Sequence, residues 1–66
     1  MSKVTGYVAR DENDTLWFHF RKPRRTTDIW ESTDDNFYIP EEYFPDFIDL
    51  EWKDKPVKVE INIEKI

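Results

Sequence analysis

Cysteine is absent from this 66-residue chain, and glycine occurs only once. Without cysteine there is no disulfide, no thiolate metal ligand and no cysteine nucleophile, and such a composition fits a reducing cytoplasm. The single glycine argues against a glycine-hinged second module, so we expect one domain over residues 1–66. No stretch approaches the roughly 20 apolar residues that a membrane-spanning helix requires. The sequence therefore predicts a cytoplasmic protein with no membrane partner.

Large aromatic side chains are plentiful, with three Trp, three Tyr and five Phe. A domain of this length buries only roughly 60% of the surface that its unfolded chain exposes. Each large ring buries on the order of 150–250 Å², which partly makes up for the small core. Although 38% of the residues are charged, this apolar content is too high for a disordered polyelectrolyte. We expect a folded domain of modest stability.

Apolar and polar residues alternate strictly over residues 57–64. Successive side chains of a strand point to opposite faces, so this pattern predicts a strand that is half buried. The side chains expected to line the core are those of Val57, Val59, Ile61 and Ile63.

Two β-prone runs, Val4 to Arg10 and Leu16 to Arg21, flank an acidic turn at residues 11–14. Asn and Asp tolerate turn conformations without glycine, so the runs predict a hairpin. Its register depends on the loop length: three residues would place Tyr7 beside Trp17, and four residues would place Val8 there.

Burial favours one orientation of the second strand of this hairpin. Covering Leu16, Phe18 and Phe20 costs less free energy than covering the alternate set. The sequence therefore places Trp17, His19 and Arg21 on the outer face of the hairpin.

The middle of the chain reads as two further strands and a short turn. Residues 26–32 predict a third strand, and residues 37–39 a fourth strand that ends at Pro40. With a proline at its start, the segment that follows predicts one helical turn near residues 41–47. The expected fold is all-β, a small curled antiparallel sheet or barrel-like roll of four or five strands, and α+β is the alternative. The expected core residues are Phe18, Phe20, Ile29, Ile39, Phe44, Val59 and Ile61.

Charge is distributed unevenly along the chain. Residues 1–25 hold six basic and three acidic side chains (+3), residues 26–54 ten acidic and one basic (−9), and residues 55–66 three basic and two acidic (+1). These segments sum to the net charge of −5. An acidic middle of this strength predicts a field that steers partners.

The outer face of the hairpin leads into a basic loop and forms one candidate binding surface. Aromatic rings that stack on bases, combined with cations that pair with phosphates, are typical of proteins that bind single-stranded nucleic acid. The isoelectric point near 4.7 counts against that function. The residues of this candidate are Trp17, His19, Arg21, Lys22, Arg24 and Arg25.

The acidic middle forms the second candidate surface and carries the favoured hypothesis. We expect a non-enzymatic accessory domain that binds a protein partner through this segment, and single-stranded nucleic-acid binding is the alternative. The sequence is also compatible with a homodimer, because aromatic residues on a sheet face can contact a second copy of the chain as readily as a different partner. The acidic candidate residues are Asp34, Asp35, Glu41 and Glu42.

Catalytic and metal-binding patterns are weak in this sequence. His19 is the only histidine, and no spacing places Ser2 or Ser32 beside it with an orienting carboxylate. Residues 11–15 lack the glycine and the bidentate glutamate of a calcium loop. We therefore predict no enzyme activity, no metal and no cofactor.

Two resemblances to known proteins bear on fold and function. The stretch from Phe37 to Phe44, with Pro40 and Tyr43 in a Pro-x-x-Tyr pattern, resembles the segment before the last strand of SH3 domains, which implies a small barrel and a proline-peptide groove. The succession Leu16-Trp17-Phe18, Ile29-Trp30 and Leu50-Glu51-Trp52-Lys53-Asp54 is similar to small uncharacterised proteins of bacterial chromosomes and prophages. That resemblance implies an accessory protein of a bacterium, phage or mobile element, and it transfers no catalytic residue.

Overall fold

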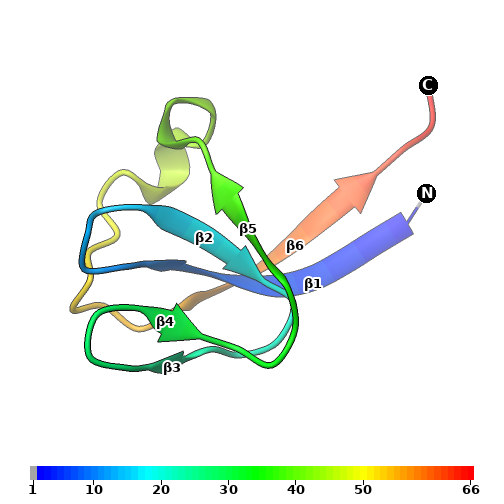
Figure 1. Ribbon diagram of the computed structural model, residues 1–66. Helices are drawn as coiled ribbons and strands as arrows, with labels where there is room; N and C mark the ends of the chain where they lie inside the picture. Colours follow the sequence, from blue (N-terminus) through cyan, green and yellow to red (C-terminus); the bar gives the residue numbers. More distant parts are fainter. Residues whose placement is uncertain (1) are drawn as a thin grey trace.

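A computed structural model describes residues 2–66 of the chain as an all-β fold (Figure 1). The all-β class expected from the sequence is confirmed, and the helical turn expected near residues 41–47 is present as two consecutive 3₁₀ turns. The elements are β1 (Ser2–Arg10), β2 (Leu16–His19), β3 (Arg24–Arg25), β4 (Trp30–Glu31), β5 (Asn36–Ile39), η1 (Glu41–Tyr43), η2 (Pro45–Phe47) and β6 (Val57–Ile63).

Four strands form an antiparallel sheet in the order β5-β2-β1-β6, and β3 pairs with β4 in a separate two-stranded sheet. Strand β1 is long, and only its second half, Tyr7–Arg10, pairs with β2. Its first residues pair with β6 alone, from Ser2 opposite Ile63 onward. Figure 1 shows these two strands extending together past the rest of the sheet.

The β1–β2 hairpin has a loop one residue longer than the longer of the two predicted loops. Ala9 lies opposite Trp17, so both predicted registers, with Tyr7 or Val8 in that place, are wrong. The N–H of Asp11 donates to the carbonyl of Thr15 at 2.9 Å, and Asp14 adopts a φ of 76°. Asp tolerates this left-handed conformation better than most residues, which allows the five-residue loop to close.

The third strand predicted over residues 26–32 is instead the turn and second half of the β3–β4 hairpin. The N–H of Thr26 donates to the carbonyl of Ile29 at 2.8 Å. The Thr26 hydroxyl also donates to the Ile29 carbonyl at 2.8 Å, and the hydroxyl oxygen accepts from the N–H of Ile29 at 3.2 Å. Such local side-chain bonds compete with strand pairing, which explains why the chain turns here.

One face of the four-stranded sheet carries the apolar core. Val8, Leu16, Phe18 and Ile39 are buried there, and the segment through η1 and η2 covers them. This segment reaches only part of the face. Of the seven expected core residues, Phe18 and Ile39 are buried and Val59 is half buried. Phe20, Ile29, Phe44 and Ile61 are exposed, so those four predictions are wrong.

The opposite face of the sheet contacts the β3–β4 hairpin. Ala9 and His19 are buried on this face, and Trp30 of β4 is buried beside it. The backbone N–H of Trp30 donates to the Asp11 carboxylate at 2.9 Å, which joins the small hairpin to the β1–β2 loop. Within residues 2–66, the structure contains no helix of the length and apolar character needed to cross a membrane.

Candidate functional site

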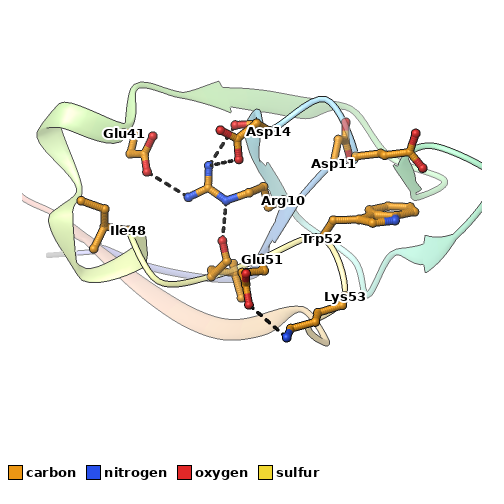
Figure 2. A pocket seen from close by; sticks show the side chains of 10 residues that line it. Arg10, Asp11, Asp14, Glu41, Ile48, Glu51, Trp52 and Lys53 are labelled. Atoms are coloured by element: carbon orange, nitrogen blue, oxygen red, sulfur yellow. Dashed lines mark hydrogen bonds and ion pairs between the residues drawn. The ribbon is translucent and has the colours of Figure 1, made fainter.

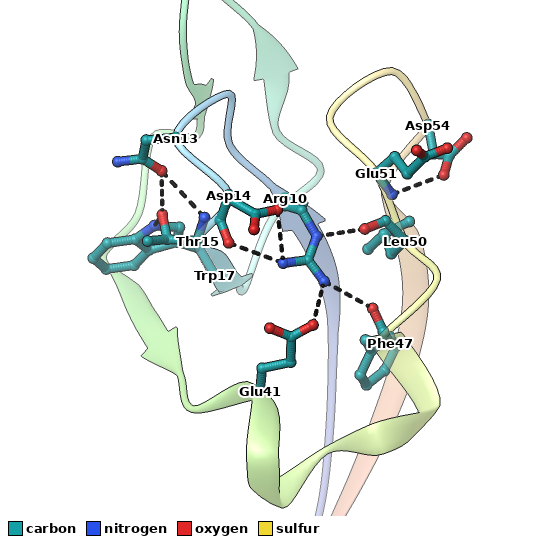
Figure 3. A network of polar contacts seen from close by, with 10 residues as sticks. All are labelled: Arg10, Asn13, Asp14, Thr15, Trp17, Glu41, Phe47, Leu50, Glu51 and Asp54. Atoms are coloured by element: carbon teal, nitrogen blue, oxygen red, sulfur yellow. Dashed lines mark hydrogen bonds and ion pairs between the residues drawn. The ribbon is translucent and has the colours of Figure 1, made fainter.

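A buried arginine organises the end of the molecule where the β1–β2 loop meets η1 and η2 (Figure 3). The Arg10 side chain is 5% exposed, and its guanidinium donates to both the carbonyl and the carboxylate of Asp14, at 2.9 and 3.3 Å. It also donates to Glu41 Oε1 at 3.0 Å, to the Phe47 carbonyl at 3.1 Å and to the Leu50 carbonyl. Arginine suits this position because its planar fork can satisfy several oxygens at once.

A hollow of about 480 Å³ lies beside this arginine, and its lining includes Asp11, Glu51, Trp52 and Lys53 (Figure 2). Burial raises the pKa of Asp11 above its ordinary value, and nearby Asp28 raises it further, while the hydrogen bond from Trp30 N–H lowers it. The Lys53 ammonium lies 3.4 Å from Glu51 Oε2. The Arg10 guanidinium already has oxygen partners from three chain segments, so its role here is to hold the fold together.

His19 is fully buried, although its place in the sequence pattern predicts the outer face of the hairpin. Its Nδ1 lies 2.9 Å from Ser32 Oγ, a pairing that no spacing in the sequence indicates. The Ser32 hydroxyl lies 3.3 Å from the Asp34 carbonyl, to which it can only donate, so its oxygen accepts from His19 Nδ1–H. Burial lowers the pKa of His19, which favours the neutral ring. In this tautomer the His19 nitrogen that faces Ser32 carries a proton and cannot accept one from the Ser32 hydroxyl. The pair therefore holds β2 to the loop after β4.

The basic residues of the first candidate surface are only partly brought together. Arg21, Lys22 and Arg24 line one hollow of about 490 Å³, which also includes Ser32. The Arg21 guanidinium forms an ion pair with Asp34 at 2.8 Å. Arg25 lies apart from them.

The guanidinium of Arg25 stacks on two indole rings. Its Cζ lies 4.8 Å from the ring centroids of both Trp30 and Trp52, and Nη2 donates to the Trp52 carbonyl at 2.7 Å. The two indole rings also meet edge to face, with centroids 6.0 Å apart, and this cluster attaches the loop before β6 to the β3–β4 hairpin. Trp17 is half buried, with its ring edge-on to Tyr38 at 5.9 Å and its Nε1–H donating to Thr15 Oγ1 at 2.9 Å. Stacking on an added base would compete with these contacts.

The four acidic candidate residues lie at opposite ends of β5. Asp34 and Asp35 precede the strand, whereas Glu41 and Glu42 follow it in η1. Asp34 is paired with Arg21 and Glu41 with Arg10, while Asp35 and Glu42 are exposed. The structure therefore does not gather these four carboxylates into one surface.

An open apolar groove lies on the part of the sheet that η1 and η2 leave uncovered. It consists of two adjoining hollows of about 280 and 370 Å³, which share Phe18 and Ile61. The first hollow is lined only by apolar side chains, and the second also has Asp46 and Glu60 in its wall. We use the name apolar groove for the surface formed by Val4, Phe18, Phe20, Phe37, Phe44, Phe47, Val59, Ile61 and Ile63.

Aromatic packing fixes one wall of the apolar groove. Phe18 and Phe20 meet edge to face at 5.1 Å, and Phe20 and Phe37 do so at 5.6 Å. Such edge-to-face pairs add stability beyond the area that they bury, so this wall is preformed. The sequence did contain a signal for the groove: the alternation over residues 57–64 supplies more apolar side chains than one short covering segment can bury.

Comparisons of the chain with protein-family models, with curated proteins and with solved structures found no match. The resemblances to SH3 domains and to bacterial and prophage proteins therefore stay predictions. Among the residues that the structure describes, no group of three or more His, Cys, Asp or Glu side chains is arranged to hold a metal ion.

Proposed function

We propose that this chain is a non-enzymatic protein-interaction domain and that the apolar groove is its docking surface. The observation that supports the proposal is the exposure of large apolar side chains along a single sheet face. Phe37 is 52% exposed, Ile63 56% and Ile61 41%. Exposed apolar residues scattered singly are ordinary on protein surfaces, but a contiguous set bordering a preformed hollow is typical of binding sites.

The exposed area is large for a protein of this size. Phe20, Phe37, Phe44, Ile61 and Ile63 are each about half exposed. Taking roughly 200 Å² for each complete side chain, they present on the order of 450 Å² of apolar surface. Patches of roughly 300–600 Å² are the largest that typical monomers carry, and they are often functional.

Charge around the groove indicates the chemistry of the partner. Asp46 and Glu60 are the charged residues in its described wall, and both are acidic. Lys3 lies 3.8 Å from Glu60 at an exposed position, where an ion pair contributes little. Asp46 belongs to the segment of residues 26–54, whose net charge is −9, so this segment adds negative potential on its side of the groove. We therefore propose a partner segment whose apolar side chains enter the groove and whose flanking residues are Lys or Arg.

A peptide titration followed by backbone-amide NMR tests this proposal. The probe is an 18-residue amphipathic peptide of Leu and Lys, compared with a peptide in which Glu replaces every Lys. We expect shifts concentrated at Phe20, Phe37 and Ile61 with the Lys peptide and much weaker ones with the Glu peptide. Equal binding of both peptides, or shifts away from the groove, would contradict the proposed partner chemistry.

Neighbouring residues of β5 provide a matched pair of variants. Phe37 lines the groove, whereas Tyr38 points to the other face and is 58% exposed. Phe37→Ser should weaken binding of the Lys peptide at least tenfold, and Tyr38→Ser should leave it within about threefold. A mixed-sequence single-stranded oligonucleotide is the probe for the alternative function. Salt-sensitive shifts at Arg21, Lys22 and Arg24 would favour nucleic-acid binding instead.

A further inference from the structure

Strand β6 leaves one long edge of the sheet unpaired. Its seven residues pair with β1 on one side, and within residues 2–66 its other side has no strand neighbour. The opposite edge strand, β5, is shorter, with four residues, and Pro40 follows it directly. Proteins usually protect long edge strands with proline, bulges, charged side chains or a covering segment, because unpaired backbone groups recruit other strands. Residues 57–63 contain no proline and pair with β1 in a continuous register without a bulge, so a strand that pairs with β6 has only the charges of Lys58 and Glu60 to match.

Charges near β6 permit two copies of the chain to meet there. Although the whole protein carries −5, residues 55–66 carry +1. Self-association at this edge therefore avoids the repulsion that the acidic middle would cause at any surface it forms. Within β6, Lys58 and Glu60 carry opposite charges, and a second carboxylate, Glu64, directly follows the strand.

We propose that two copies of this protein pair antiparallel through β6, with the two-fold axis at Ile61. In this register Ile61 faces Ile61 of the second copy, and Val59 faces Ile63. Lys58 then lies opposite Glu64 of the second copy, and symmetry repeats this pair. Opposite charges directly across an antiparallel ladder stabilise it, so the pairing has both a backbone and a side-chain contribution.

The neighbouring registers are less favourable. An axis at Glu60 would place two like charges directly opposite each other, which destabilises a ladder. An axis at Val59 would oppose Lys58 to Glu60, which is an attractive pair. However, it would bring Pro56, which cannot donate a hydrogen bond, into the ladder beside Asn62. The axis at Ile61 avoids both the like-charge pair and the proline.

The dimer has a consequence for the groove. Because the axis is perpendicular to the sheet, the apolar faces of the two copies lie on the same side of one eight-stranded sheet. The two apolar grooves then adjoin across β6. The pairing itself rests on the strand edge and its charges, so it does not depend on the groove being a docking surface.

Sedimentation velocity over a range of protein concentrations tests the proposal with charge-reversal variants. We expect concentration-dependent dimers of the unmodified chain. Lys58→Glu and Glu64→Lys should each weaken dimerisation roughly tenfold, because each variant turns two attractive pairs into two repulsive ones. The double variant exchanges the charges and should restore the dissociation constant to within about threefold of the starting value. Lys55→Glu makes the same charge change outside β6 and should have no such effect.

Several outcomes would overturn the proposal. A chain that stays monomeric at millimolar concentration lacks the pairing altogether. If adding Glu60→Lys to Lys58→Glu restores dimerisation, and adding Glu64→Lys does not, the two-fold axis lies at Val59 instead. If the charge variants of β6 leave dimerisation unchanged but Phe37→Ser abolishes it, the dimer is a face-to-face assembly through the apolar groove.

Discussion

Replacing the only glycine with alanine should destabilise the fold by more than an alanine normally costs in a strand. Gly6 lies in β1 opposite Val59, on the face that carries the core. A Cβ added there would clash with the tip of the Phe18 ring and would lie 2.6 Å from the carbonyl oxygen of His19. The ring can shift only by disturbing the core, and the carbonyl belongs to the backbone of β2.

The magnitude follows from two opposing contributions. Overpacking a closely packed position costs about 1–3 kcal/mol. Replacing glycine with alanine also restricts the unfolded chain, which returns about 0.4–1 kcal/mol. Taking the upper part of the first range, because a backbone atom is involved, Gly6→Ala should lose about 2 kcal/mol. In a domain of this size that loss corresponds to a decrease of roughly 8–16 °C in the melting temperature.

Thermal and urea unfolding of four proteins measure this effect. They are the unmodified chain, Gly6→Ala, Phe18→Leu and the double variant. Leucine lacks the ring atoms that meet the added methyl group, so the double variant should be more stable than the sum of the single effects predicts, by about 0.5–1 kcal/mol. If Gly6→Ala melts with the unmodified chain, β1 and the Phe18 ring do not approach each other as described.

Three other predictions concern buried polar groups. Arg10→Lys should lose about 2 kcal/mol in urea unfolding, since one ammonium cannot satisfy oxygens from three segments; an unchanged midpoint would contradict that role. At pH 7, Asp11→Asn should unfold at the same urea concentration as the unmodified chain or at a higher one. Burial raises the pKa of Asp11, so the stabilising contribution of this carboxyl group is lost as pH rises above 3.8. Asp11→Ala, which removes the acceptor of Trp30 N–H, should lose about 1–3 kcal/mol, so equal midpoints for the two variants would refute this account. The pKa of His19 is lowered by burial, so stability should fall as pH decreases below 6.5, and His19→Gln should flatten this dependence between pH 7.5 and 5.5.

Local patterns in the sequence predicted where strands and turns form more accurately than they predicted which side chains are buried. The acidic turn after Arg10 and the alternation over residues 57–64 each specify a strand or hairpin from neighbouring residues alone, and both elements are present. The loop length was wrong because it depends on the left-handed φ of Asp14, which no composition rule requires of an Asp in that position.

Burial could not be predicted in the same way, because it depends on distant segments. Period-two alternation predicts on which face of the sheet Ile61 and His19 lie, but it does not predict which segments cover those faces. His19 is covered by the β3–β4 hairpin and by Ser32 in the loop after β4, whereas Ile61 lines an open hollow beside η2 and stays 41% exposed. The candidate site changed for this reason: the residues selected for their charge are dispersed, with Arg21, Asp34 and Glu41 in ion pairs, and several residues selected for the core form the apolar groove.

The pairing of β1 with β6 also determines when the fold can be completed. Ser2 pairs with Ile63 and Val8 with Val57, so this ladder joins parts of the chain that are separated by nearly its whole length. Contacts of such long sequence separation slow folding, because most of the chain must be ordered before they form. During synthesis, β1 therefore has no partner on its β6 side until residues 57–63 have left the ribosome, so the four-stranded sheet stays incomplete until then.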